Sequence, residues 1–417
     1  MHQKPGKINW IIILIYFILV FIGWASIYSS SYNPESSFDL INTKTIYGKQ
    51  LLFIACSFIV SIFILLVDIK IITRLGYIVY FASIISLILV LFIGKEVGGA
   101  KAWFNFGSFG LQPAEFAKYG TILAISKFIN DKNIYLNKSI NTLKVCSFIL
   151  LPFLLILKQP DAGSALIFTA LIIMFFREGL QIRYMFFGII SLLLCLSTIV
   201  VGVSVTIIIL IFLNIGFAYL LKKHKKILLP ALVTFIIGIL IVGSVNYGYD
   251  NILQPHQKER IDIIIGKEKN NLGSGYNLNQ SLIAIGSGGF WGKGYLNGTQ
   301  TKFNFVPEQN TDFIFCTIGE EFGFAGSSII IMLFMTLIVQ IIWISEKQTS
   351  RFSRIYGYSL SAILFAHIVI NISMTLGIMP VIGIPLPFIS YGGSSLLSFS
   401  ILLFTFLKLD SYRIYRF

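Results

Sequence analysis

Long apolar runs separated by short polar segments dominate the chain. A membrane-spanning helix needs about 20 mostly apolar residues, and fewer where neighbouring helices cover its ends. The pattern predicts one helix over each of twelve runs: 8–28, 50–67, 77–94, 113–130, 143–157, 162–177, 184–200, 202–221, 228–246, 311–344, 356–379 and 386–408. We therefore expect an all-α, polytopic transmembrane helix bundle, formed as a single integral membrane domain over residues 1–417.

Two of the twelve runs differ from an ordinary membrane-spanning segment. The run 113–130 is the weakest candidate, because it carries Glu115 and Lys118. The first run, 8–28, follows two lysines and resembles a signal peptide. However, it is about 20 residues long and lacks a clear small-residue cleavage site. We interpret it as a retained first span.

Composition supports a membrane protein. Of the 417 residues, 56% are hydrophobic and only 12% are charged, and the mean hydropathy is +0.83. Roughly a quarter of the residues are charged in an ordinary globular domain, so a water-soluble fold is excluded. The four cysteines lie in or beside apolar runs without metal-ligand spacing, so they indicate neither a disulfide framework nor a zinc site.

The net charge of +14 reflects topology rather than nucleic-acid binding. Twenty of the 32 Lys and Arg residues fall in the two termini and in alternate short loops, where they mark the cytoplasmic side. Basic clusters interleaved with aromatic residues on a polar domain are missing from the sequence. We therefore expect both termini in the cytoplasm and no nucleic-acid partner.

Two polar stretches then lie outside the membrane, Gly94–Gln112 and a large extracytoplasmic loop over 247–310. Structureless loops as long as the second are uncommon unless they are functional. The sequence therefore predicts that the chemistry takes place on the outer face.

Ionisable residues inside spans usually face the protein interior and are candidates for function. Glu115 and Lys118 are three residues apart, on one helix face. A structural ion pair is an equally good interpretation of this spacing. His367, in the eleventh run, is more typical of a hydrogen-bonded packing residue than of a proton relay.

Two aspartates stand at predicted outer helix ends. Asp161 lies in a tight turn, where capping of the following helix is its commoner role. Asp312 begins the run 311–344, and a cap formed by Thr311 or Asp312 is again an alternative. A carboxylate partly removed from water at this boundary could act as a general base.

Further acidic and glycine-rich features accompany Asp312. Glu320 and Glu321 lie two to three turns deeper, where we do not expect capping to account for them. The glycine-dense run Gln280–Gly294 could cradle a phosphate or form a re-entrant turn packed on the bundle, and its Lys293 would suit an anionic headgroup. Gly377–Gly393 contains three prolines and four glycines. Broken backbone at membrane depth is tolerated only where protein or a cavity surrounds it, so this segment is expected to border a site.

Several of these segments, in order along residues 10–408, resemble the signature blocks of the SEDS family, which comprises RodA, FtsW and SpoVE. The matching blocks are Gly98–Trp103, Gln112–Lys118, Gln159–Gly163, Gly273–Tyr276, Gln280–Gly294, Gly298–Gln300, Pro307–Phe315, Gly319–Glu321 and Pro385–Ser394. The triplet Gly298–Gln300 resembles the RodA branch more than the FtsW branch.

The resemblance implies an inverting peptidoglycan glycosyltransferase of the bacterial plasma membrane, active in cell elongation and cell-shape maintenance. Such enzymes polymerise lipid II, the undecaprenyl-pyrophosphate-linked disaccharide-pentapeptide, on the outer side of the membrane. Their partner is a class B penicillin-binding protein, a transpeptidase, and they are embedded in membrane lipid.

Two departures from the family pattern stand out. Family members usually have ten spans, and the surplus here lies in 183–246. Ala114 replaces the serine that is common in the family's Gln-Pro-Ser-Glu motif.

By analogy, the essential aspartate of the family corresponds to Asp312, the predicted catalytic residue. Glu115, Lys118, Asp161 and Glu321 match other polar positions of the family's central cavity and, with Lys293, form the predicted substrate-binding set. In the resulting hypothesis, Asp312 deprotonates the acceptor sugar 4-hydroxyl. Lys118, loop cations or a divalent metal such as Mg or Mn, whose ligands the sequence does not identify, would stabilise the departing pyrophosphate.

Two other functions are alternatives. A transporter of lipid-linked precursor would also have many spans and buried charges, but it would be expected to contain internal repeats with paired broken helices. Such symmetry between the halves is not evident in the sequence. A non-catalytic scaffold of the wall-synthesis complex is the third hypothesis, in which the buried acids are structural.

Overall fold

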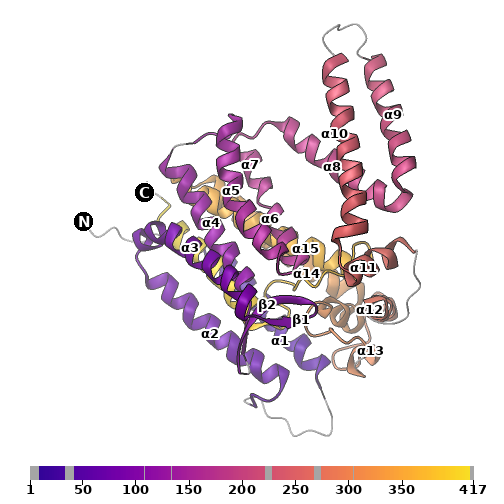
Figure 1. Cartoon of the computed structure of the whole chain (residues 1–417). Helices are drawn as coiled ribbons and strands as arrows, with labels where there is room; N and C mark the ends of the chain where they lie inside the picture. Colours follow the sequence, from indigo (N-terminus) through magenta and orange to yellow (C-terminus); the bar gives the residue numbers. More distant parts are fainter. Residues whose placement is uncertain are drawn as a thin grey trace. The chain divides into compact units, whose positions relative to one another are not determined.

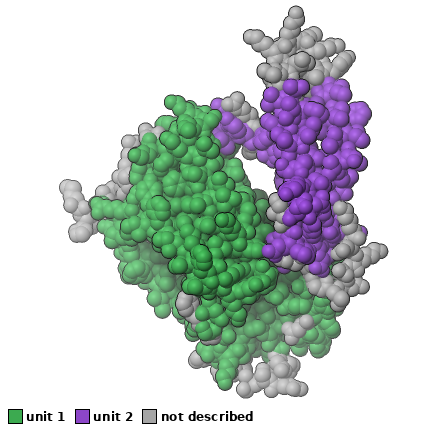
Figure 2. All heavy atoms as spheres, viewed as in Figure 1, with its two compact units in different colours: residues 1–179, 272–417 green, residues 180–271 purple. Residues whose placement is uncertain are grey.

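The chain is mostly helical in the computed structural model, which describes residues 9–32, 42–107, 109–132, 134–220, 228–266, 274–303 and 305–413 (Figure 1). The structure divides into two compact units, one formed by residues 1–179 with 272–417 and the other by residues 180–271 (Figure 2).

The first unit contains twelve α-helices and a small sheet among its described residues. The helices are α1 (Trp10–Ser30), α2 (Ile46–Leu66), α3 (Ile69–Ile93), α4 (Pro113–Asp131), α5 (Ser139–Leu157), α6 (Ala162–Thr169), α7 (Ile172–Arg177), α12 (Ser274–Gly288), α13 (Thr299–Lys302), α14 (Ile314–Glu346), α15 (Arg351–Thr375) and α16 (Gly393–Ser411).

The second unit contains α8 (Ile182–Val201), α9 (Val203–Leu220), α10 (Leu228–Tyr247), the π-helical turn η1 (Gly248–Ile252) and α11 (Pro255–Ile265). Helices α9 and α10 lie side by side (Figure 1). The region 183–246, in which the sequence places the two surplus spans, therefore contains three helices.

Helix covers each of the twelve predicted runs, with shifted boundaries. The run 162–177 is divided into α6 and α7, and the last run becomes helical only at Gly393. The first residues of this run, 386–392, are not helical. They include Pro387, which lacks the backbone amide that a helix interior requires. Eight helices in the described part of the chain are long and apolar enough to cross a membrane. Twelve crossings stay a prediction.

Burial within the first unit separates central from peripheral helices. The apolar windows of α16 and α15 are 89% and 72% buried, whereas those of α5 and α2 are only 22% and 17% buried. Helices α15 and α16 therefore form the core of this unit. The exposed aliphatic and aromatic side chains of α2 and α5 suit contact with lipid.

The expectation of an all-α fold was incomplete, because the stretch Gly94–Gln112 forms a small antiparallel sheet. Strands β1 (Lys95–Val97), β2 (Ala100–Phe106) and β3 (Phe109–Leu111) lie in the order β1-β2-β3. Gly98 and Gly99 join β1 to β2 with φ values of +60° and +82°. Two successive residues with positive φ are typical of a two-residue hairpin turn, and the Gly-Gly pair was the sequence signal for it.

Helix α14 is interrupted at Gly323, where φ is 64° and ψ is −160°. The amides of Phe324 and Ala325 donate to the carbonyls of Gly289 and Phe290, at 2.9 and 3.0 Å. These bonds replace those that an unbroken helix would make to residues 320 and 321.

The two carbonyls released by the break also find partners. The carbonyl of Glu320 accepts from the amide of Lys293 at 3.0 Å, and that of Glu321 accepts from Gly294 at 2.9 Å. The turn after α12 thus satisfies the backbone groups that the break exposes.

We expect Gly323→Ala to destabilise the protein, because a Cβ there would lie 2.3 Å from the Gly292 amide nitrogen at a positive φ. The cost should be about 2 kcal/mol or more, and thermal unfolding of the purified, detergent-solubilised chain measures it. Gly243→Ala in α10 is the control, since its Cβ would meet no described heavy atom within 4 Å. Equal unfolding midpoints for the two variants would contradict the proposed constraint.

Candidate active site

Asp312 lies against the non-helical segment 376–392, which joins α15 to α16. The Asn371 side-chain amide donates to the backbone carbonyls of Asp312, at 2.8 Å, and Ile384, at 2.7 Å. A Cβ on Gly383 would lie 3.1 Å from Oδ2 of Asp312, so only a residue without a side chain leaves this carboxylate its present room. Asn371 therefore connects the two segments that flank the carboxylate.

Backbone contacts fix the same junction. The Ser390 hydroxyl donates to the Thr311 carbonyl at 2.7 Å, and the Tyr391 amide donates to the Asn310 carbonyl at 2.8 Å. The segment 376–392 thus bonds two successive residues before α14, and Asn371 of α15 bonds the third. That this segment borders a site stays a prediction.

The half-buried Asp312 does not occupy the capping position of α14. That position belongs to Phe313, and the helix begins at Ile314. The alternative that Thr311 or Asp312 caps this helix is therefore wrong, which leaves the position of Asp312 without a helix-capping explanation.

Asp161 does cap a helix, as the sequence favours. Its Oδ1 accepts from the Ser164 amide at 2.9 Å at the start of α6, and its Oδ2 accepts from Nε2 of Gln112 at 2.9 Å. A Cβ on Gly163 would lie 2.5 Å from the Ile382 carbonyl oxygen. Asp161 and Asp312 are thus both next to the segment 376–392.

Glu115 and Lys118 form the predicted ion pair and join it to His367. The Lys118 ammonium lies 2.8 Å from Oε1 of Glu115 and 2.9 Å from Nε2 of His367, and all three side chains are almost fully buried. His367 Nδ1 lies 3.2 Å from the Pro385 carbonyl. Because this carbonyl can only accept, the neutral tautomer with its proton on Nδ1 satisfies both contacts.

A polar path therefore leads from α4 across α15 to the site. His367 and Asn371 are four residues apart, on one face of α15, and both contact the segment 376–392. The hydrogen-bonded packing role predicted for His367 agrees with this geometry. Asn371 was missed, although an amide one turn after a histidine in an apolar run was a usable signal.

A second polar cluster surrounds Glu320. Its carboxylate lies 2.7 Å from the Lys293 ammonium and accepts from the amides of Thr299, Gln300 and Thr301, at 2.8, 2.9 and 3.0 Å. The expectation that capping does not account for this residue was wrong, because Glu320 caps α13, a helix distant from it in sequence. The Lys293 ammonium is therefore bonded within the protein, to Glu320 and to the Thr299 hydroxyl.

Glu321 joins α14 to α1. It accepts from the Ser29 hydroxyl and, at 3.1 Å, from the Leu296 amide, while its buried Oε2 has no hydrogen-bond partner among the described residues. The neighbouring Ser30 hydroxyl bonds Asn310, two residues before Asp312. The end of α1 therefore contacts both the Glu321 cluster and the segment that carries Asp312.

The structure thus divides the predicted site residues into two groups. Asp312, Asp161 and the Glu115–Lys118 pair surround the segment 376–392, whereas Lys293 and Glu321 belong to the cluster next to the α14 break. Within Gln280–Gly294, Gly288 and Gly292 approach α14 closely, as the packed-turn alternative predicts. Within the ranges that the structure describes, His, Cys, Asp and Glu side chains do not gather in threes in a way that would hold a metal ion.

The long apolar helices, the interruption of α14 at Gly323, the non-helical segment 376–392 and the buried charges define a polytopic membrane protein with a polar interior. The family model for FtsW, RodA and SpoVE, described as cell cycle protein, matches residues 9–212 and 196–414. The chain belongs to this family.

Individual relatives cover most of the chain. The peptidoglycan glycosyltransferase RodA of Treponema pallidum is 30% identical over 93% of this chain and 94% of its own. The peptidoglycan glycosyltransferase MrdB of Escherichia coli K12 is 32% identical over 76% of this chain and 73% of its own. Stage V sporulation protein E of Bacillus subtilis is 28% identical over 95% of each chain.

Solved structures share the fold. A chain from a structure titled as the coordination of polymerization and crosslinking by a peptidoglycan synthase complex matches with a TM-score of 0.71 and 23% identity, over 98% of both chains. The rod shape determining protein RodA of Thermus thermophilus matches with a TM-score of 0.64 and 21% identity, also over 98% of both chains.

We expect Lys118→Met to destabilise the protein by about 3–5 kcal/mol, because it leaves the buried Glu115 carboxylate without its cation. The double variant Glu115→Gln/Lys118→Met should recover much of this loss, since it removes both charges. Thermal unfolding of the purified single and double variants measures the coupling. Additive losses would show that the pair does not stabilise the fold.

Proposed function

We propose that the protein is a peptidoglycan glycosyltransferase that polymerises lipid II into glycan strands. The observation that carries this proposal is the half-buried Asp312, held at the start of α14 by Asn371 and the segment 376–392. Family membership and relatives named as peptidoglycan glycosyltransferases support the reaction class.

In the proposed reaction, the Asp312 carboxylate takes the proton of the acceptor sugar 4-hydroxyl. The hydroxyl oxygen attacks the anomeric carbon of the donor as the bond to the pyrophosphate breaks, which inverts the configuration. Asp312 is suited to this role because its backbone is held in place and its half-buried carboxylate is available to accept a proton.

The departing pyrophosphate requires positive charge nearby. Both lysines are ion-paired within the protein, Lys118 with Glu115 and Lys293 with Glu320, but Lys118 is only 2% exposed, whereas 25% of the Lys293 side chain is exposed. This difference favours Lys293 as the cation that meets the substrate, with Lys118 and Glu115 supporting the site from behind. Asp161 and Glu321 complete the proposed substrate-binding set, and the proposal includes no step through a metal.

The proposal includes a location and a partner. We place the protein in the bacterial plasma membrane, with twelve crossings, both termini in the cytoplasm and 247–310 on the outer face, as the distribution of Lys and Arg favours. The fold shared with a chain of a peptidoglycan synthase complex supports a class B penicillin-binding protein as the partner. Elongation and cell-shape maintenance are the processes we propose, from the relatives named RodA and MrdB.

A lipid II transporter and a non-catalytic scaffold are the competing functions. Purified protein supplied with labelled lipid II distinguishes them, because only a polymerase forms long glycan in detergent, where there are no two compartments to transport between. Moenomycin should not inhibit the formation of this glycan. This insensitivity controls for a contaminating polymerase of a different class.

We expect Asp312→Ala to reduce glycan formation by about 10²-fold or more, because the general base is lost. Gel analysis of labelled product from the purified full chain measures this loss. The matched control is Asp131→Asn, which neutralises an exposed carboxylate at the C-terminal end of α4 and should leave the rate of glycan formation unchanged. Robust polymerisation by Asp312→Ala, at wild-type protein level and stability, would refute the role of Asp312.

A further inference from the structure

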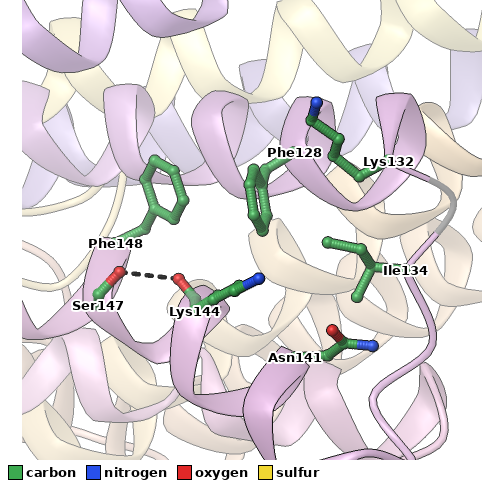
Figure 3. Close-up of a pocket in the computed structure, with 7 residues that line it drawn as sticks. All are labelled: Phe128, Lys132, Ile134, Asn141, Lys144, Ser147 and Phe148. Atoms are coloured by element: carbon green, nitrogen blue, oxygen red, sulfur yellow. Dashed lines mark hydrogen bonds between the residues drawn. The ribbon is translucent and has the colours of Figure 1, made fainter.

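A cavity of about 620 Å³ opens where α4 ends and α5 begins, away from the candidate active site. Its lining residues are Phe128, Lys132, Ile134, Asn141, Lys144, Ser147 and Phe148 (Figure 3). The 19 residues of α4 span about 28 Å, so the cavity is at the far end of this helix from Gln112 and Asp161. Its volume is within the usual range for small-molecule sites.

The cavity is basic. Lys132 comes from the end of α4 and Lys144 from the second turn of α5, and both side chains are exposed. Neither ammonium group forms an ion pair within the described ranges, and the lining contains no acidic residue. Two basic groups elsewhere in this unit, Arg351 and Arg354, both pair with Glu178. In Figure 3 the Lys144 ammonium points toward the other lining residues, whereas the Lys132 ammonium points away from them. An anion in the cavity would therefore meet Lys144 directly, and Lys132 after a rotation of its exposed side chain.

The remaining wall of the cavity is apolar. The rings of Phe128 and Phe148 lie with their centroids 5.1 Å apart, and Ile134 is almost fully buried beside them. A ligand that fills this space would thus combine a negative group with an apolar portion.

The cavity is continuous with the lipid-facing surface of α5. An exposed apolar stripe extends along one face of this helix, formed by Ile140, Leu143, Leu150, Leu151, Leu154 and Leu157. The exposed Ser147 belongs to both surfaces: it lines the cavity, and helical periodicity places it within the stripe, between Leu143 and Leu150. Acyl chains on the stripe would therefore leave a headgroup at the mouth of the cavity.

We propose that this cavity binds the phosphate headgroup of an anionic phospholipid, with Lys132 and Lys144 on the phosphate and the acyl chains along α5. Basic pockets between membrane helices on the cytoplasmic side characteristically hold anionic headgroups. The distribution of Lys and Arg assigns this end of α4 to that side. A free phosphate would share the contacts to the lysines but not those to the stripe.

Native mass spectrometry of the purified full chain in neutral detergent tests the proposal. Phosphatidylglycerol should bind, phosphatidylcholine with the same acyl chains should bind much less, and inorganic phosphate at equal concentration should not compete. Lys132→Gln/Lys144→Gln should weaken phosphatidylglycerol binding by about tenfold or more. Lys70→Gln/Lys347→Gln, which removes two exposed lysines outside the cavity, should leave binding unchanged.

A second variant separates the cavity from general attraction between charges. Ser147→Trp leaves every charge in place but blocks the passage between cavity and stripe, and it should also weaken binding. The proposal would be overturned by any of three results. These are equal binding of phosphatidylglycerol and phosphatidylcholine, an equal loss of phosphatidylglycerol binding in the two double lysine variants, and unchanged phosphatidylglycerol binding by Ser147→Trp. Competition by inorganic phosphate would overturn the lipid as the ligand.

Discussion

The polar interior of this protein depends on a requirement that a membrane imposes on any interrupted helix, namely that every backbone amide and carbonyl released by the break has a partner in the protein. At Gly323 of α14, four such groups are satisfied by the turn 289–294. Because of this exchange, Glu320 and Glu321, which lie in α14 just before the break, are next to the turn 289–294 rather than next to acyl chains. The cap of α13 and the contact with α1 both depend on that placement.

The segment 376–392 is the second place where irregular backbone is surrounded by protein. It receives side chains from α15 and contacts the residues before α14, and α6 packs against it. Since α15 and α16, which flank it, are the most buried of the eight candidate spans, its position is set by the core rather than by solvent. The carboxylate of Asp312 therefore lies on a rigid support, as accurate proton transfer requires.

Much of the fold could be predicted from the sequence, because membrane helices are encoded by the length of local apolar runs. The helix over 113–130 was recognised despite its charges, and the Glu115–Lys118 pair followed from spacing alone. What could not be predicted depends on contacts between distant segments. The cap that Glu320 provides for α13 joins residues about 20 apart across a loop, and no local pattern encodes it. The link from Asn371 to Asp312 spans 59 residues. The β-sheet in Gly94–Gln112 was missed because β1 and β3 have only three residues each, too few for a periodic signal, and because the Gly98-Gly99 hairpin signal was not used.

The direction of the exchange at Gly323 has a consequence for biosynthesis. The turn that supplies the replacement hydrogen bonds precedes α14 in the chain, so it leaves the ribosome before the helix it completes. For these hydrogen bonds, the interrupted helix therefore does not depend on a segment that is translated after it. An equivalent break whose partner lay downstream would expose those groups to hydrocarbon throughout the synthesis of the intervening residues.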